Sequence, residues 1–213
     1  MSALQAVSRS FLLVVAVAIS ACYSINGPES KGSRDARWAN PLKVEGLPNF
    51  HQITPALYRG AQPEASGMRE LKKRGIKTIV NFRHRHSDMD VLRSVGLEQY
   101  FNYIEIPTNT RSIDDDTVIQ FLSVVKNRQN RPIFFHCQYG ADRTGTMAAA
   151  YRIVVQGWRK EEAIREMKGG GFGFHALWRH LPKYLESLDI KKIRSALGSD
   201  GISSMEPPNE TTL

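Results

Sequence analysis

The strongest constraint on the fold is an apolar strand pattern that runs through a short polar loop into an apolar helix pattern. Residues 131–136, RPIFFH, contain an unbroken apolar run that is typical of a strand covered on both faces. Residues 144–157 are apolar nearly all round, which indicates a buried helix. The loop between them therefore follows the carboxyl end of a buried strand, where α/β proteins bind ligands.

Similar patterns alternate along the rest of the chain. The predicted strands cover residues 56–60, 77–82, 100–107 and 131–136. The predicted helices cover residues 63–75, 114–127, 144–157, 159–169 and 177–190. This alternation predicts a single α/β domain with a central, mostly parallel sheet of roughly four to five strands flanked by helices.

Residues 1–21 resemble a secretory signal peptide. Arg9 precedes the apolar stretch FLLVVAVAIS, which is too short to span a bilayer as a helix. The stretch ends in ISAC, which resembles a bacterial lipobox whose cysteine, here Cys22, is acylated and becomes the mature N-terminus. Ordinary cleavage near Ala21 is the alternative. We therefore expect secretion across the inner membrane, a periplasmic or cell-envelope location and membrane attachment through a lipid on Cys22.

Two segments with few core-forming residues flank the predicted domain. Residues 22–45 are rich in Ser, Gly, Pro and charge, which predicts a flexible tether. Residues 199–213 have the composition of a disordered tail. The folded domain is expected over residues 46–198.

The charge distribution narrows the class of partner. The formal net charge is +8, but the basic residues are scattered singly or in pairs along the chain. A nucleic-acid surface requires basic residues interleaved with aromatic residues along one stripe. The pattern therefore argues against a nucleic-acid partner and favours an anionic substrate.

The loop after the buried strand has the chemistry of a phosphate site. Cys137 is one of two cysteines in the 213-residue chain, and its place at a helix N-terminus near Arg143 favours the nucleophilic thiolate. Gly140 allows a sharp bend, and Arg143 can hold two phosphate oxygens as a planar fork. The backbone N–H groups of a tight loop form a nest for an anion. The predicted nest consists of Gln138, Tyr139, Gly140 and Ala141.

The loop resembles the signature of cysteine-dependent protein tyrosine phosphatases. That signature is a histidine and a cysteine, then five residues, then an arginine and a hydroxyl residue, here His136, Cys137, Arg143 and Thr144. From residue 46 to about residue 190 the chain is similar to compact bacterial members of the dual-specificity branch. The resemblance implies that Cys137 attacks phosphorus, that a phosphocysteine forms and that water hydrolyses it, with no metal or cofactor. It also implies that Thr144 donates to the sulfur and that His136 holds the loop.

The resemblance leaves two residues open as the general acid that protonates the leaving oxygen. Many relatives carry an aspartate on a mobile loop ahead of the cysteine, and Asp114 is the aspartate nearest to that position. Asp142, immediately before Arg143, instead resembles the placement in myotubularin-like lipid phosphatases, where an aspartate inside the loop is proposed to act.

Several arginines are expected near the same loop. Arg59, Arg83 and Arg85 follow the first two predicted strands and can meet acidic groups of the substrate, although loop arginines are often simply solvated. Arg83 is the favoured substrate-binding residue because it lies nearest its strand. Residues 84–88, HRHSD, lack a third histidine or cysteine nearby, so no metal site is expected.

These features predict a protein-tyrosine or dual-specificity phosphatase that acts on a phosphorylated protein. One alternative is a phosphoinositide or inositol-phosphate phosphatase, although the loop interior QYGAD lacks the lysines of several polyphosphoinositide-specific relatives. The other alternative is a catalytically weak phosphate-binding module. A sulfurtransferase is disfavoured because the loops of that class usually have fewer residues between the cysteine and the arginine than the five found here.

Overall fold

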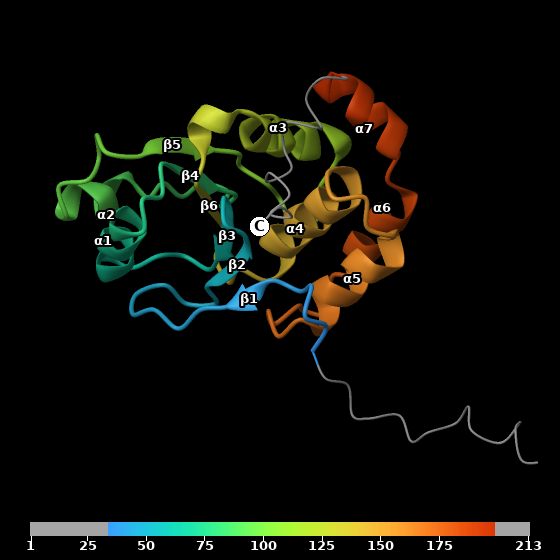
Figure 1. Cartoon of the computed structure of the whole chain (residues 1–213), viewed down its shortest axis with the longest axis horizontal. Coiled ribbons are helices and arrows are strands. Elements are labelled where there is room, and N and C mark those ends of the chain that lie inside the picture. The colour runs from blue at the N-terminus through green and yellow to red at the C-terminus, as the bar shows by residue number, and fades with distance from the viewer. Residues whose placement is uncertain (1–33, 199–213) are drawn as a thin grey trace, which may run out of the picture. The chain divides into compact units, whose positions relative to one another are not determined.

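The computed structural model describes residues 34–198 (Figure 1). A compact unit begins at Arg37, so residues 37–45 of the expected tether belong to the folded unit. Ala39 in this segment is buried, with 2% of its surface exposed. The expected signal peptide, the start of the tether and the expected tail lie outside the described residues. Within residues 34–198, no helix has the length and apolar character needed to cross a bilayer.

A sheet of six strands forms the centre of the unit, in the order β1-β2-β3-β6-β4-β5. The strands are β1 (Asn40–Pro41), β2 (His51–Thr54), β3 (Leu57–Gly60), β4 (Thr78–Asn81), β5 (Asn102–Glu105) and β6 (Ile133–His136). Strands β3, β6, β4 and β5 run parallel, while β1 and β2 add an antiparallel edge. The predicted α/β class, single domain and mostly parallel sheet are confirmed, with β1 and β2 as additional strands.

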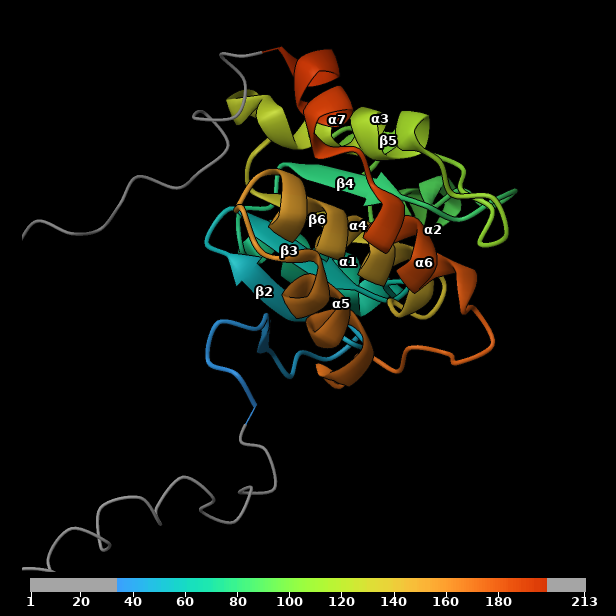
Figure 2. The same cartoon turned by 90° about the vertical axis from the view of Figure 1, so that its right-hand side faces the viewer.

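Helices cover both faces of this sheet (Figures 1 and 2). They are α1 (Ala65–Lys73), α2 (Met89–Ser94), α3 (Asp115–Lys126), α4 (Asp142–Val154), α5 (Lys160–Gly169), α6 (His180–Ser187) and α7 (Ile190–Leu197). Helices α1 and α2 pack on one face, and α3 to α7 pack on the other. Helix α2 was not predicted. The helix predicted over residues 177–190 is instead two helices, α6 and α7, separated by Leu188 and Asp189, and the backbone of Asp189 is extended.

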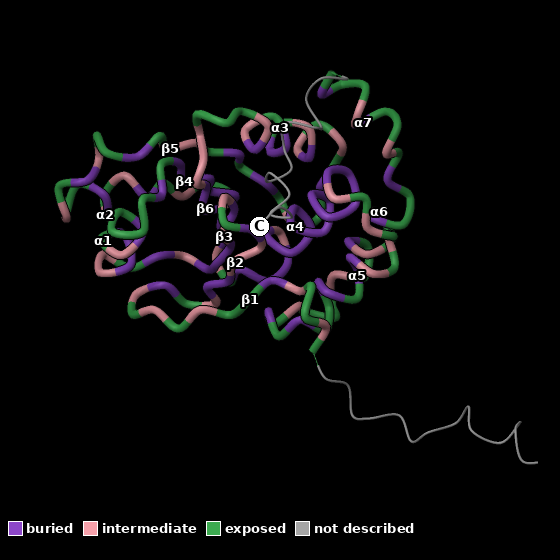
Figure 3. The backbone as a smooth tube through the Cα atoms, in the orientation of Figure 1, coloured by how far each residue is buried: buried purple, intermediate pink, exposed green. Residues whose placement is uncertain are grey.

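The central strand β6 explains why the site lies at its end. Phe134 belongs to the apolar cluster under α1, and Phe135 belongs to the cluster under α3 and α4. Both phenylalanines are fully buried, as expected for a strand covered on both faces. Figure 3 shows that β6 and α4 are both largely buried. Two rigid, buried elements therefore hold the two ends of the loop between His136 and Asp142.

Candidate active site

The loop between β6 and α4 depends on the glycine at its bend. Gly140 has a φ of +67°, a conformation that side chains rarely adopt. A Cβ at this position would lie 2.5 Å from the carbonyl carbon and oxygen of Gly60 at the end of β3. The close approach of the two backbones therefore requires glycine and fixes the loop against the sheet. The thiol of Cys137 follows β6 directly, and its residue is 2% exposed.

Three residues outside the loop hold its backbone, and each donates to a loop carbonyl. Arg59 Nη2 donates to Gly140 O at 2.6 Å, Asn49 Nδ2 to Tyr139 O at 2.9 Å and Gln62 N–H to Gln138 O at 3.3 Å. A trans peptide directs its N–H opposite to its C=O. The N–H groups of Tyr139, Gly140 and Ala141 therefore face away from these donors, as an anion nest requires.

Arg143 is held from the neighbouring strand ends. Its Nη1 donates to Phe82 O at 3.2 Å and to Thr108 O at 3.4 Å, at residues that follow β4 and β5. These bonds use one end of the guanidinium, so the other donors of its fork can serve an anion. Thr144 is fully buried, and its hydroxyl makes no hydrogen bond to the described residues. The expected hydrogen bond from this hydroxyl to the sulfur of Cys137 is therefore not formed in this structure.

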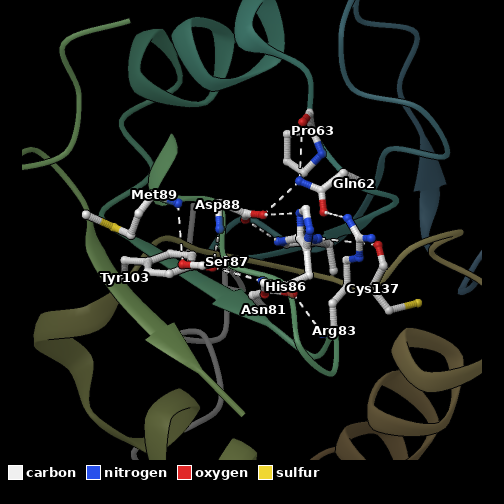
Figure 4. Close-up of polar contacts among 11 residues, drawn as sticks. Gln62, Pro63, Asn81, Arg83, His86, Ser87, Asp88, Met89, Tyr103 and Cys137 are labelled. Carbon is white, nitrogen blue, oxygen red and sulfur yellow. Dashed lines mark hydrogen bonds and ion pairs between the residues drawn. The ribbon is translucent and has the colours of Figure 1, made fainter. Parts of the chain in front are cut away.

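A chain of polar side chains lies beside Cys137, and Figure 4 shows its members Gln62, Arg83 and Asp88. Asp88 Oδ2 lies 2.8 Å from His136 Nε2, and Asp88 Oδ1 accepts from Gln62 Nε2 at 2.8 Å. Gln62 Oε1 in turn accepts from Arg83 Nη1 at 2.8 Å. Burial alone would raise the pKa of Asp88, but the hydrogen bond and charge of His136, with the bond from Gln62, hold that pKa below its ordinary value.

Arg83 lies within electrostatic reach of the reactive groups. Burial lowers the pKa of Arg83, and the nearby charge of Arg143 lowers it further, against the opposing effects of Asp88 and Cys137. Arg83 therefore lies within electrostatic range of Arg143 and Cys137, and its role in substrate binding stays a prediction. Arg59 differs from its expected place at the mouth, because it is buried beneath Gly140 and stacks on Phe172 at 3.7 Å. Within residues 34–198, no group of three or more potential ligands is placed to hold a metal ion.

The two predicted general acids have different surroundings. Asp114 is exposed and caps α3, where it accepts from Thr117 N at 2.9 Å and from Thr117 Oγ1 at 2.7 Å. These hydrogen bonds lower the pKa of Asp114. Asp142 is buried, and both of its oxygens face His175, which lies 33 residues further along the chain. Of these two aspartates, only Asp142 is adjacent to the loop in the sequence.

Sequence reasoning missed the residues that support the loop from a distance. Gln62, Asp88 and His175 lie in connecting segments, and their partners are 21 to 48 residues away in the chain. Contacts between residues so far apart in the chain leave no pattern in the local sequence. A polar residue just after a strand, as Gln62 is after β3, was the one available signal.

A cysteine at the start of an anion-binding loop, with an arginine at the loop's other end, defines a cysteine-dependent phosphatase. Comparison with known families gives the same class. The model of the family described as a DSP-PTPase phosphatase fused to NAD+ kinase matches residues 45–178. The chain belongs to this family of phosphatases.

Curated relatives and solved structures agree with this assignment. The dual specificity protein phosphatase TpbA of Pseudomonas aeruginosa is 31% identical over 195 residues, which cover 89% of this chain and 86% of TpbA. The crystal structure of TpbA is similar with a TM-score of 0.68 at 32% identity, covering 78% of this chain and 99% of that chain, and a cysteine-to-serine variant of TpbA was solved with pTyr. The inositol diphosphatase DSP3 of Arabidopsis thaliana is 26% identical over 155 residues, covering 70% of this chain and 74% of DSP3.

Proposed function

We propose that this phosphatase removes phosphate from phosphotyrosine in proteins, with Cys137 as the nucleophile. The observation that carries the proposal is the loop itself. Its carbonyls are tied to Asn49, Arg59 and Gln62 on the outside, so its N–H groups converge where the thiolate and Arg143 meet a phosphate. The arrangement supplies a nucleophile and the donors that stabilise charge on the transferring oxygens.

In the first step the sulfur of Cys137 attacks phosphorus in line, the bond from phosphorus to the leaving oxygen breaks and that oxygen takes a proton. In the second step water attacks the phosphocysteine, loses a proton and releases phosphate and the thiolate. Arg143 and the loop N–H groups hold the three equatorial oxygens through both steps. Steady-state release of phosphate separates this enzyme from a catalytically weak phosphate-binding module.

Phosphotyrosine is favoured because an aromatic side chain stands on the loop. Tyr139 is 63% exposed and can pack against the ring of the substrate. TpbA, the relative described above, has been solved in complex with pTyr. We expect phosphotyrosine peptides to have a higher kcat/KM than phosphoserine peptides, and Tyr139→Ala to reduce that difference. Equal kcat/KM values for the two peptide classes would contradict the preference.

An inositol phosphate is the second candidate substrate, supported by the similarity to an inositol diphosphatase and by Arg83 beside Arg143. A second cation near the first favours a substrate that carries more than one anionic group. The same kinetic panel therefore includes an inositol polyphosphate and a phosphoinositide in vesicles. A kcat/KM for either that exceeds the value for phosphotyrosine peptides would replace the first proposal by the second.

The substitution Cys137→Ser tests the mechanism. The serine hydroxyl is a poor nucleophile at neutral pH, so we expect kcat to fall on the order of a thousandfold or more while the fold and phosphate binding remain. The measurements are phosphate release, circular dichroism and substrate binding. A variant that keeps more than a tenth of the wild-type rate would refute the role of Cys137.

We also propose that Cys22 carries a lipid and attaches the enzyme to the cell envelope. The lipobox-like ISAC segment supports this, and stable attachment needs the several acyl chains of a mature bacterial lipoprotein. Mass spectrometry of the mature N-terminus tests it. An unmodified Cys22, or a mature chain that begins after it, would contradict the proposal.

A further inference from the structure

The carboxylate of Asp142 is directed to one residue, His175. Asp142 Oδ1 accepts from the backbone N–H of His175 at 3.0 Å, and Asp142 Oδ2 lies 2.8 Å from Nδ1 of the same residue. The side chain of Asp142 is 9% exposed, whereas that of His175 is 50% exposed. Because Nδ1 faces Asp142, the second ring nitrogen, Nε2, is the one that can meet solvent or substrate.

His175 also contacts the loop at a second place. Its ring lies 5.7 Å from the ring of Tyr139 in an edge contact at an interplanar angle of 64°. It follows a glycine-rich segment in which Gly171 and Gly173 have positive φ angles, and Asn49 binds Phe172 O in that segment at 2.8 Å. The imidazole is therefore fixed between Tyr139, near the thiol, and Asp142, next to the phosphate-binding Arg143.

We propose that His175 is the general acid and base of this phosphatase and that Asp142 positions it. The inference rests on the proposed phosphatase function. When the sulfur attacks and the leaving oxygen departs, Nε2–H gives its proton to that oxygen. When water then attacks the phosphocysteine, the neutral Nε2 takes the proton from the water. The two transfers balance, so His175 ends the cycle protonated, as it began.

Among the groups around His175, the imidazole is the one placed to transfer a proton. Within residues 34–198, the titratable groups that contact His175 are Asp142 at the start of α4 and Tyr139 in the loop. The guanidinium of Arg143 is held at Phe82 O and Thr108 O, and that of Arg59 is held at Gly140 O. An imidazole that is oriented by a carboxylate through Nδ1 has a defined ring position, which is the arrangement that general acid–base catalysis uses.

The test compares His175→Asn with the wild type on an aryl phosphate that has an activated leaving group and on an unactivated alkyl phosphate. A poor leaving group needs the proton most. We expect kcat on the alkyl ester to fall roughly 100-fold or more, and kcat on the activated ester to fall less than about 10-fold. The basic limb of the pH profile should disappear. Substitution of an exposed histidine after β4, His84→Asn, serves as the matched control and should change neither profile.

The substitution Asp142→Asn separates positioning from proton transfer. If Asp142 acts through His175, this variant should be impaired on the same ester, and the double variant should be little worse than His175→Asn alone. A His175→Asn enzyme that keeps its basic limb and falls equally on both esters would overturn the inference. So would loss of the basic limb in Asp114→Asn alone. Failure of the proposed function looks different, because the wild type itself would then release no phosphate.

Discussion

Arg143 shows how much of the site depends on the shape of one side chain. Its Nη1 is bound to the carbonyls of Phe82 and Thr108, which holds one end of the guanidinium at the carboxyl ends of β4 and β5. In Arg143→Lys the charge remains, but an ammonium group cannot bind the strand ends and two phosphate oxygens together. We expect kcat/KM to fall roughly 100-fold or more. Steady-state kinetics on an aryl phosphate measures this, and a decrease of less than about fivefold would contradict the clamping role.

Asp88 links the loop to stability at acid pH. Its folded-state pKa lies below the ordinary value of about 3.9, so its contribution to the unfolding free energy is complete above that value and is lost as the pH falls through the folded-state pKa. We expect Asp88→Asn to lower the unfolding free energy by about 2 kcal/mol at pH 7. Below about pH 4 the difference should shrink. Urea denaturation at several pH values tests this, and a constant difference down to pH 2 would refute it.

At the residue scale, sequence reasoning identified the groups whose chemistry is local. Cys137 and Gly140 lie in one short loop and Arg143 lies in the first turn of the helix that follows it, so their spacing in the sequence predicted the site. The positioning of His136 by Asp88 depends on two segments that are adjacent only in the fold. The same holds for the contact of Asp142 with His175, which no pattern in the sequence indicates.

At the scale of elements, Asp114 has a role that is independent of catalysis. It accepts from the backbone N–H of Thr117 and so caps α3, whose remaining length packs through Val118, Phe121 and Leu122. Asp114→Ala should lower the unfolding free energy by about 1 kcal/mol because the cap is lost. Asp116→Ala, in the exposed first turn of the same helix, is the control and should cost less. Thermal denaturation measures both.

The kinetics of the same variant decide between the two expected acids. If Asp114 only caps the helix, Asp114→Ala should keep kcat on both activated and unactivated esters at a temperature well below its melting point. Selective loss on the unactivated ester would show that Asp114 donates the proton, and would also contradict the role inferred for His175.

Helices and strands with many buried apolar residues could be predicted from the sequence, and those with few could not. The strands β4 and β6 and the helix α4 are buried on nearly all sides and carry apolar runs, whereas α3 carries buried residues at a clear helical period. Strand β1 has two residues and pairs with β2, and β2, HQIT, has one aliphatic residue and pairs with β3, so neither carries a strand pattern of its own. Helix α2 has only Leu92 fully buried, which is too little for a periodic signal.

At the scale of the whole molecule, the segment before β2 ties the N-terminal side of the folded unit to α4 and α5. Glu166 Oε1 accepts from Ala39 N at 2.6 Å, and Arg152 Nη2 donates to Arg37 O at 3.0 Å. Arg152 and Glu166 are themselves a buried ion pair, with Nε and Oε2 2.8 Å apart. The segment thus completes the hydrogen bonding of a charged pair that is otherwise surrounded by protein.

Two truncations test where the folded unit begins. A chain that starts at residue 34 should keep the wild-type melting temperature. A chain that starts at residue 46 loses β1 and both bonds to the buried pair, and its unfolding free energy should fall by roughly 3 kcal/mol. Calorimetry of the two chains measures the difference. Equal melting temperatures would mean that residues 37–45 contribute nothing to the fold.

The solitary thiol of the site has a consequence for oxidative damage. Hydrogen peroxide converts a thiolate to a sulfenic acid, which many enzymes protect by forming a disulfide with a second cysteine. The chain has only Cys22 besides Cys137, and Cys137 is the one cysteine within residues 34–198. An oxidised Cys137 therefore finds no resolving cysteine in its own folded unit. Reduction of the sulfenic acid therefore depends on an external thiol that can reach a buried sulfur. Further oxidation to the sulfinic acid would inactivate the enzyme irreversibly.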